Sequence, residues 1–64
     1  MRILLKRKEV VRRTALSPSQ IYRLMDDGEF PRQVQLSVRS VAWIESEIEA
    51  WIDNRIDASG RKAA

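Results

Sequence analysis

The sequence predicts a small, mostly helical domain with one β-hairpin, in the order strand, helix, helix, strand, strand, helix. Three observations predict it: helix start and stop signals in residues 16–28, polar–apolar alternation in residues 33–43, and a helical apolar stripe in residues 44–56. Because 64 residues suffice for one domain only, we expect a single folded unit over residues 1–57. The remaining residues, 58–64, are small, polar and basic, which predicts a disordered tail.

The first helix is predicted over residues 6–14. A short lead-in, residues 2–5, precedes it, and we expect this segment to be an extended strand or a strap across the core. Val10 and Val11 form the buried edge of the helix. Because a helix restricts the χ1 angles of β-branched side chains, this segment depends on tertiary packing.

The strongest local signals belong to a second helix, predicted over residues 18–27. Ser17 is the N-cap, Pro18 occupies the first helical position, and Gln20 completes a capping box with Ser17. Gly28 ends the helix because glycine tolerates the left-handed conformation that follows many helices. The buried stripe of this helix consists of Ile21, Leu24 and Met25.

A β-hairpin is predicted after the second helix. Residues 33–36 alternate polar and apolar side chains, residues 41–43 form a second extended run, and residues 37–40 make the polar loop between them. Two short helices joined by a tight turn form a helix-turn-helix, and a hairpin beside them is a wing. The predicted fold class is therefore a winged helix-turn-helix.

A last helix is predicted to begin within residues 44–46 and to end near Arg55. Its apolar residues have the spacing of one buried helix face. They are Ile44, Ile48, Trp51, Ile52 and Ile56. Ser46 and Glu49 have the spacing of a second capping box, so the start is defined only to within one turn. Trp43 and Trp51 fit core positions better than platforms for base stacking.

The composition argues against catalysis and metal binding. The sequence contains no cysteine and no histidine, which removes the usual nucleophile–base pairs and transition-metal ligands. Glu45, Glu49 and Asp53 repeat every four residues, and we interpret them as the solvent-facing side of the last helix, not as a metal site. We expect no enzymatic activity, no cofactor and no metal.

The charge distribution points to a polyanion. Residues 1–16 contain six basic residues and one acidic residue, a net charge of +5, whereas residues 45–64 have a net charge of −2. Such a dipolar molecule orients its basic end toward nucleic acid. No apolar run is long enough to cross a membrane, and no signal peptide is evident. We expect a cytoplasmic protein.

Three polar side chains of the second helix are candidates for reading base edges: Ser19, Gln20 and Arg23. An α-helix fits the major groove of DNA, and residues near its N-terminus approach the bases. Glutamine can pair bidentately with adenine and arginine with guanine, each worth about 1–3 kcal/mol of discrimination. The alternatives are that Gln20 only closes its capping box and that Arg23 pairs with Asp26 or Asp27.

Contacts to the DNA backbone are expected from the basic residues of the first helix and from Ser17, Tyr22 and Arg39. Because the basic residues of the helix cannot all face one duplex, Arg7 and Lys8 at its start are favoured over Lys6, Arg12 and Arg13. Such contacts give affinity without sequence information. The alternative roles are a helix cap for Ser17, cover for the core by the ring of Tyr22, and a solvated loop charge for Arg39.

In the order and spacing of its motifs, the sequence resembles the AlpA-type prophage regulators. These are relatives of phage excisionases and of MerR-like winged helix-turn-helix domains. The resemblance rests on Leu5, residues 8–10, residues 16–31, residues 34–36, Arg39 and residues 41–52. Members of this group are small bacterial DNA-binding proteins that activate or repress mobile-element genes, and some promote excision. The resemblance implies that residues 17–23 belong to the reading helix and that Arg39 is a wing residue.

The sequence departs from this group in two turns. The turn between the helices commonly has glycine where this chain has Ala15. Because a left-handed alanine costs about 1 kcal/mol, we expect a reshaped turn. The wing turn commonly contains glycines but here reads Ser-Val-Arg-Ser over residues 37–40, which affects the shape of the wing.

The sequence thus predicts a sequence-specific, double-stranded DNA-binding transcriptional regulator of a prophage or other mobile element. Its expected partners besides DNA are further copies of itself on repeated half-sites and an integrase or RNA polymerase. One alternative is an excisionase-like architectural factor that bends DNA for an integrase. An alternative of another class is a protein-interaction module that uses the basic first helix.

Overall fold

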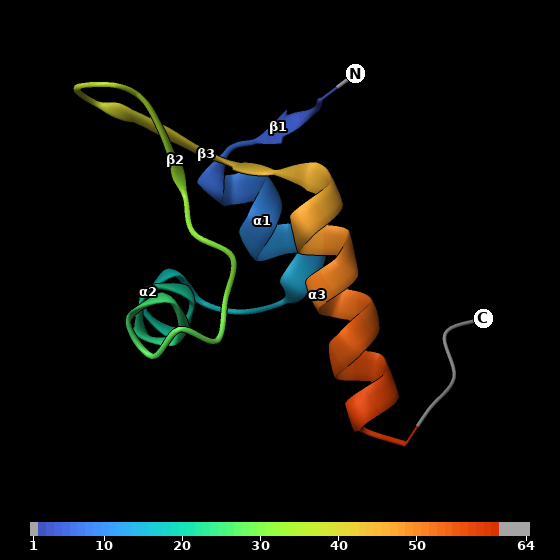
Figure 1. The fold of residues 1–64 in the computed structure, drawn as a ribbon. Coiled ribbons are helices and arrows are strands. Elements are labelled where there is room, and N and C mark those ends of the chain that lie inside the picture. Colours follow the sequence, from blue (N-terminus) through green and yellow to red (C-terminus); the bar gives the residue numbers. More distant parts are fainter. Residues whose placement is uncertain (1, 61–64) are drawn as a thin grey trace.

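The computed structural model describes residues 2–60 (Figure 1). Its elements are β1 (Leu4–Leu5), α1 (Arg7–Thr14), α2 (Pro18–Asp26), β2 (Val34–Ser37), β3 (Ser40–Ile44) and α3 (Glu45–Ala58). This order and the mostly helical content confirm the predicted fold class. Figure 1 shows α2 and the β2–β3 hairpin on the same side of the molecule, away from α3.

The three strands form an antiparallel sheet in the order β1-β3-β2. Leu4 and Leu5 pair with Ile44 and Trp43, so the lead-in is a strand, which was one of its two predicted forms. The sheet ties the N-terminal segment to the hairpin and thereby fixes the wing relative to α1.

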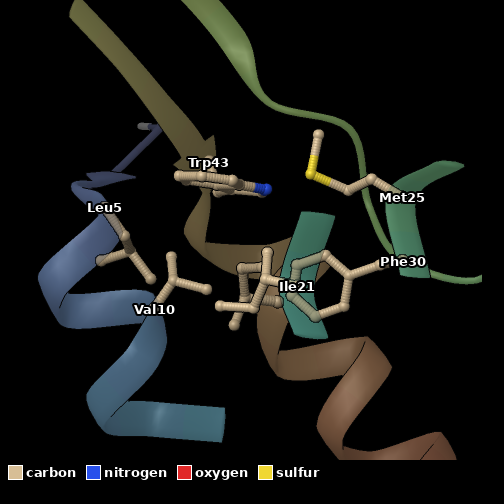
Figure 2. Close-up of a cluster of buried hydrophobic side chains, with 7 residues drawn as sticks. Leu5, Val10, Ile21, Met25, Phe30 and Trp43 are labelled. Carbon is tan, nitrogen blue, oxygen red and sulfur yellow. The ribbon is translucent and has the colours of Figure 1, made fainter. Parts of the chain in front are cut away.

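A single cluster of buried side chains draws on every helix and on two strands (Figure 2). Trp43 is fully buried, and its indole N–H donates to the carbonyl oxygen of Pro31 at 3.1 Å. Trp51 is half-buried, with its ring centroid 4.8 Å from that of Phe30 and its N–H donating to the carbonyl of Glu29 at 2.7 Å. Both tryptophans therefore belong to the core and its border, as predicted. The buried cluster is Leu5, Val10, Ile21, Met25, Phe30, Trp43 and Ile48.

Both ends of α2 have the predicted geometry. Ser17 is the N-cap, with Pro18 in the first turn and a complete capping box with Gln20. At the other end Gly28 has φ +73°, and its N–H donates to the carbonyl of Met25 at 3.1 Å. The N–H of the following residue donates to the carbonyl of Leu24 at 2.8 Å, which completes a Schellman motif.

The turn between α1 and α2 corrects one expectation. Ala15 has φ 60° and ψ 23°, so the left-handed conformation is kept and the turn is not reshaped. Its N–H donates to the carbonyl of Val11 at 2.9 Å, and the hydroxyl of Thr14 donates to the carbonyl of Val10 at 2.8 Å. Leu16 packs against the core directly afterwards. These contacts hold alanine in a conformation that it adopts only at a cost.

The wing turn is tighter than predicted. Ser37 and Ser40 pair with each other as strand residues, which leaves only Val38 and Arg39 in the turn. An irregularity in the register lies between Gln35 and Ser37. Within residues 2–60 Ala15 is the only non-glycine residue with a positive φ, so no residue of the wing turn requires the conformational freedom of glycine. The irregular register accommodates the reversal of the chain.

The start of α3 lies within the predicted range, but the predicted cap does not form. The helix begins at Glu45 after Ile44, without a side-chain cap, so the predicted capping box of Ser46 and Glu49 is wrong. The reason is tertiary: the N–H of Glu45 donates to the carbonyl of Ile3 at 2.9 Å, because β1 lies beside the start of the helix.

The C-terminal end of α3 lies at Ala58, beyond the expected end near Arg55. Gly60 follows with φ +85° and provides the stop signal that the sequence interpretation did not use. Residue 58 is therefore helical and not part of a disordered tail, while residues 61–64 of the predicted tail lie outside the described residues.

Candidate nucleic-acid interface

The face of α2 opposite the core carries the three predicted base-reading residues. Ser19, Gln20 and Arg23 are exposed, whereas Ile21 and Met25 on the other face are buried. Within residues 2–60 Arg23 makes no ion pair, so its guanidinium donors are available to a ligand. The folded domain thus presents these polar side chains on a rigid, doubly capped helix.

Gln20 and Ser17 are both engaged at the start of α2. The backbone N–H of Ser17 donates to Oε1 of Gln20 at 3.0 Å, and the Ser17 hydroxyl lies 3.2 Å from the same oxygen. In return, the N–H of Gln20 donates to Oγ of Ser17 at 3.3 Å. The cap role of Ser17 is therefore confirmed, and the side-chain oxygen of Gln20 serves the helix.

Tyr22 lies at the border of the core. Its half-buried ring packs against the core cluster, with its centroid 6.4 Å from that of Trp43. The predicted covering role of its ring is thus observed.

A basic groove of about 540 Å³ lies between the first turn of α1 and the wing turn. It brings together the favoured backbone-contacting residues Arg7, Lys8 and Arg39 with Lys6, a less favoured one. Ser40 and Val41 of β3 complete its lining. No ion pair within residues 2–60 involves these four cations, so the groove presents positive charge without internal neutralisation.

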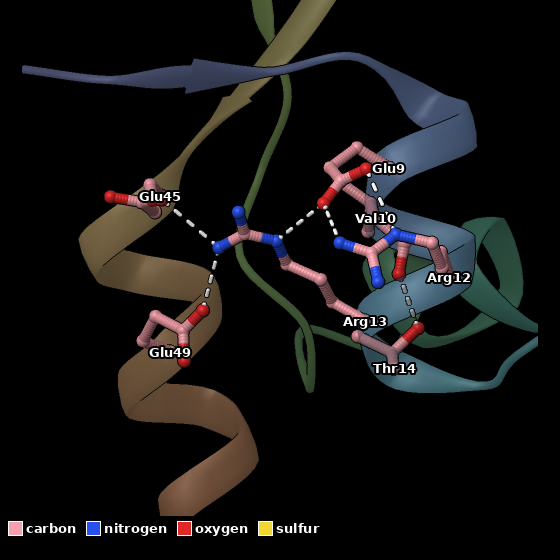
Figure 3. A network of polar contacts seen from close by, with 7 residues as sticks. All are labelled: Glu9, Val10, Arg12, Arg13, Thr14, Glu45 and Glu49. Atoms are coloured by element: carbon pink, nitrogen blue, oxygen red, sulfur yellow. Dashed lines mark hydrogen bonds and ion pairs between the residues drawn. The ribbon is translucent and has the colours of Figure 1, made fainter.

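The basic residues in the last turn of α1 have a different environment (Figure 3). Nε of Arg13 donates to Glu9 at 2.8 Å, and its Nη1 donates to Glu45 at 3.0 Å and to Glu49 at 2.8 Å. Arg12 pairs with the same Glu9 carboxylate. Glu49 and Asp53 are exposed, as predicted, whereas Glu45 is partly buried. The prediction did not include the ion pairs of Glu45 and Glu49, which form because α1 and α3 approach each other and place Arg13 between them.

These contacts shift the protonation equilibria of the groups that form them. Hydrogen bonds from Arg12 and then Arg13 lower the pKa of Glu9 from its usual value of 4.5 to about 2. The Glu9 carboxylate likewise raises the pKa of Arg12 and of Arg13. Glu9 therefore remains ionised over the whole range in which the protein is expected to act.

Residues 2–60 contain neither a candidate membrane span nor a candidate metal site. No helix in this part of the chain is long and apolar enough to cross a membrane. No group of three or more acidic side chains in the same part is arranged to hold a metal ion.

The chain is similar to known prophage regulatory proteins. Residues 3–56 match the model of the family described as prophage CP4-57 regulatory protein (AlpA). The chain is 33% identical over 58 residues to the DNA-binding transcriptional activator AlpA of Escherichia coli K12, an alignment that covers 81% of this chain and 83% of that protein.

A second relative comes from a phage. The chain is 50% identical over 54 residues to the uncharacterized protein ORF88 of Enterobacteria phage P4. This alignment covers 84% of the chain but only 59% of the phage protein, so the chain spans less than two thirds of that relative's length.

Proposed function

The chain belongs to the AlpA family of prophage regulatory proteins, and on this basis we propose that it is a sequence-specific, double-stranded DNA-binding transcriptional regulator of a prophage or other mobile element. One observation supports this function above the others. An exposed polar face on α2 and an unneutralised basic groove beside the wing occur in one small domain. The proposed location is the bacterial cytoplasm, with the nucleoid.

In this proposal α2 enters the major groove. Ser19, Gln20 and Arg23 contact base edges, because the N-terminal part of a recognition helix approaches the bases most closely. Arg23 has the clearest role: its free guanidinium matches the N7 and O6 acceptors of guanine, a contact worth about 1–3 kcal/mol of discrimination.

The flanking phosphates are contacted by a second set of residues. Arg7, Lys8 and Arg39 act from the basic groove, while Ser17 and Tyr22 act from the first half of α2. Each phosphate that a lysine or arginine neutralises releases counterions and makes the affinity more dependent on salt. These contacts set the register of the helix on the duplex but do not select its sequence.

A module of this size offers a small interface, near the low end of the roughly 600–1,000 Å² that single DNA-binding modules bury. We therefore propose that two or more copies act together on repeated half-sites. An integrase or RNA polymerase is the proposed further protein partner.

Selection of bound duplexes from a random library, at near-physiological salt, tests the proposed function. The expected result is an enriched motif, whose half-site arrangement gives the number of copies bound. Direct repeats beside an attachment site would favour an excisionase-like role over promoter control. A folded protein that enriches no motif would contradict the proposal and favour a protein-interaction module.

A further inference from the structure

The orientation of the Gln20 side-chain amide is fixed by its neighbour. A backbone N–H can only donate, so the Gln20 atom that lies 3.0 Å from the Ser17 nitrogen must be the oxygen and not the amide nitrogen. The Ser17 hydroxyl, at 3.2 Å, is directed to the same oxygen. Within residues 2–60 no acceptor binds Nε2 of Gln20, which offers two N–H donors, while Oε1 accepts from both donors of Ser17.

This arrangement changes what Gln20 can recognise. A bidentate contact to adenine requires the amide to donate to N7 and to accept from N6 at the same time. The two lone pairs of Oε1 accept from the N–H and from the hydroxyl of Ser17, so a hydrogen bond from adenine N6 has to displace one of these two donors. Arg23 is also a donor only, because a guanidinium has no acceptor.

We propose that α2 reads acceptor edges in the major groove, with Gln20 acting as a donor through Nε2 and Arg23 as a second donor. The bases whose polar groups there are acceptors only fit best, namely guanine, with N7 and O6, and thymine, with O4, whereas adenine places its N6 donor beside its single acceptor, N7. Cytosine offers only its N4 donor there and is excluded. This inference rests on the proposed DNA-binding function and specifies the bases that it selects.

The substitution Gln20→Glu separates base recognition by residue 20 from its role in the capping box. Glutamate is a standard capping-box residue, so the carboxylate keeps an acceptor for the Ser17 N–H and the melting temperature should stay unchanged. The variant loses the free N–H donors and presents an acceptor in their place. Gln20→Ala is the matched control because it removes both the donor and the capping oxygen.

The test compares motifs selected by the wild-type protein and by both variants. We expect one position of the wild-type motif to prefer guanine or thymine, and Gln20→Glu to shift that position toward cytosine by about tenfold in relative preference. Gln20→Ala should lose the preference at the same position and also lower the melting temperature. Base preferences within one protein are ratios, so repulsion between the new carboxylate and phosphate cancels.

Two outcomes would overturn the inference. A wild-type motif that Gln20→Glu leaves unchanged would remove Gln20 from reading while leaving the proposed function intact. An adenine preference that both variants abolish would show that Oε1 accepts from N6 in a bidentate contact and that Gln20 is not a donor only. A wild-type protein that selects no motif would instead overturn the proposed function.

Discussion

The two ends of α1 carry the same residue types but use them differently. In the first turn, Arg7 and Lys8 face a groove shared with the wing and have no acidic partner within residues 2–60. In the last turn, Arg12 and Arg13 are bound by carboxylates of α1 and α3. Net charge therefore overstates the number of cations that are free to bind a polyanion. The two turns differ in this respect, and the proposed phosphate-binding residues of α1 lie in the turn without acidic partners.

The largest expected effect comes from removing both cations of the first turn. Arg7→Ala combined with Lys8→Ala should weaken DNA binding about thirtyfold at 0.15 M salt and reduce the slope of log affinity against log salt by about two. The melting temperature should not fall, because neither side chain has a partner in the described fold. Titrations at several salt concentrations measure both quantities.

Arg39→Ala tests whether the wing shares that groove. We expect about fivefold weaker binding at 0.15 M salt and a reduction of the slope by about one. The matched control is Arg12→Ala, which removes the same charge from the other end of α1 and should change the affinity less than twofold. Equal losses from Arg39 and Arg12 would show that overall charge, and not the groove, sets the affinity.

Arg13→Ala should lower the stability of the fold and leave DNA binding nearly unchanged. It leaves the carboxylates of Glu9, Glu45 and Glu49 close together without the cation that lies between them, so the melting temperature should fall. The affinity of the folded variant for DNA should stay within about twofold, with a salt slope unchanged. A reduced slope would instead place Arg13 on the phosphates.

Acid titration gives the smallest effect. The pKa of Glu9 is about 2 in the folded protein against 4.5 ordinarily, so its contribution is complete above pH 4.5 and is lost as the pH falls toward 2. The melting temperature should therefore fall more steeply over this interval in the wild-type protein than in Glu9→Gln. Parallel curves for the two proteins would contradict the depressed pKa.

The contrast between α2 and α3 shows what sequence could predict. The signals of α2 are local: Ser17, Gln20 and Gly28 lie within a few residues of the helix ends that they set. The start of α3 is set by the carbonyl of Ile3, which is distant in the sequence and comes close only through the β1–β3 pairing. The spacing of Ser46 and Glu49 could not show that the carbonyl of Ile3, and not a serine side chain, would accept from the first N–H of the helix.

In the candidate site, too, features set by nearby residues could be predicted and features set by distant residues could not. The exposed position of Ser19, Gln20 and Arg23 followed from the helical period, and the structure agrees with it. The pairing of Arg13 with two carboxylates of α3 had no local signal, since it depends on how the helices cross. That Lys8 and Arg39 line one groove could likewise not be predicted from the sequence, because the groove depends on the sheet that joins the wing to α1.

The most direct test of the account compares Arg23→Ala and Lys8→Ala on a selected duplex and on a scrambled duplex of equal length. The account predicts that Arg23→Ala lowers affinity for the selected duplex about tenfold and barely changes affinity for the scrambled one. Lys8→Ala should weaken binding to both duplexes equally and flatten the salt dependence. Equal losses on both duplexes from Arg23→Ala would contradict the assignment of α2 as the reading helix.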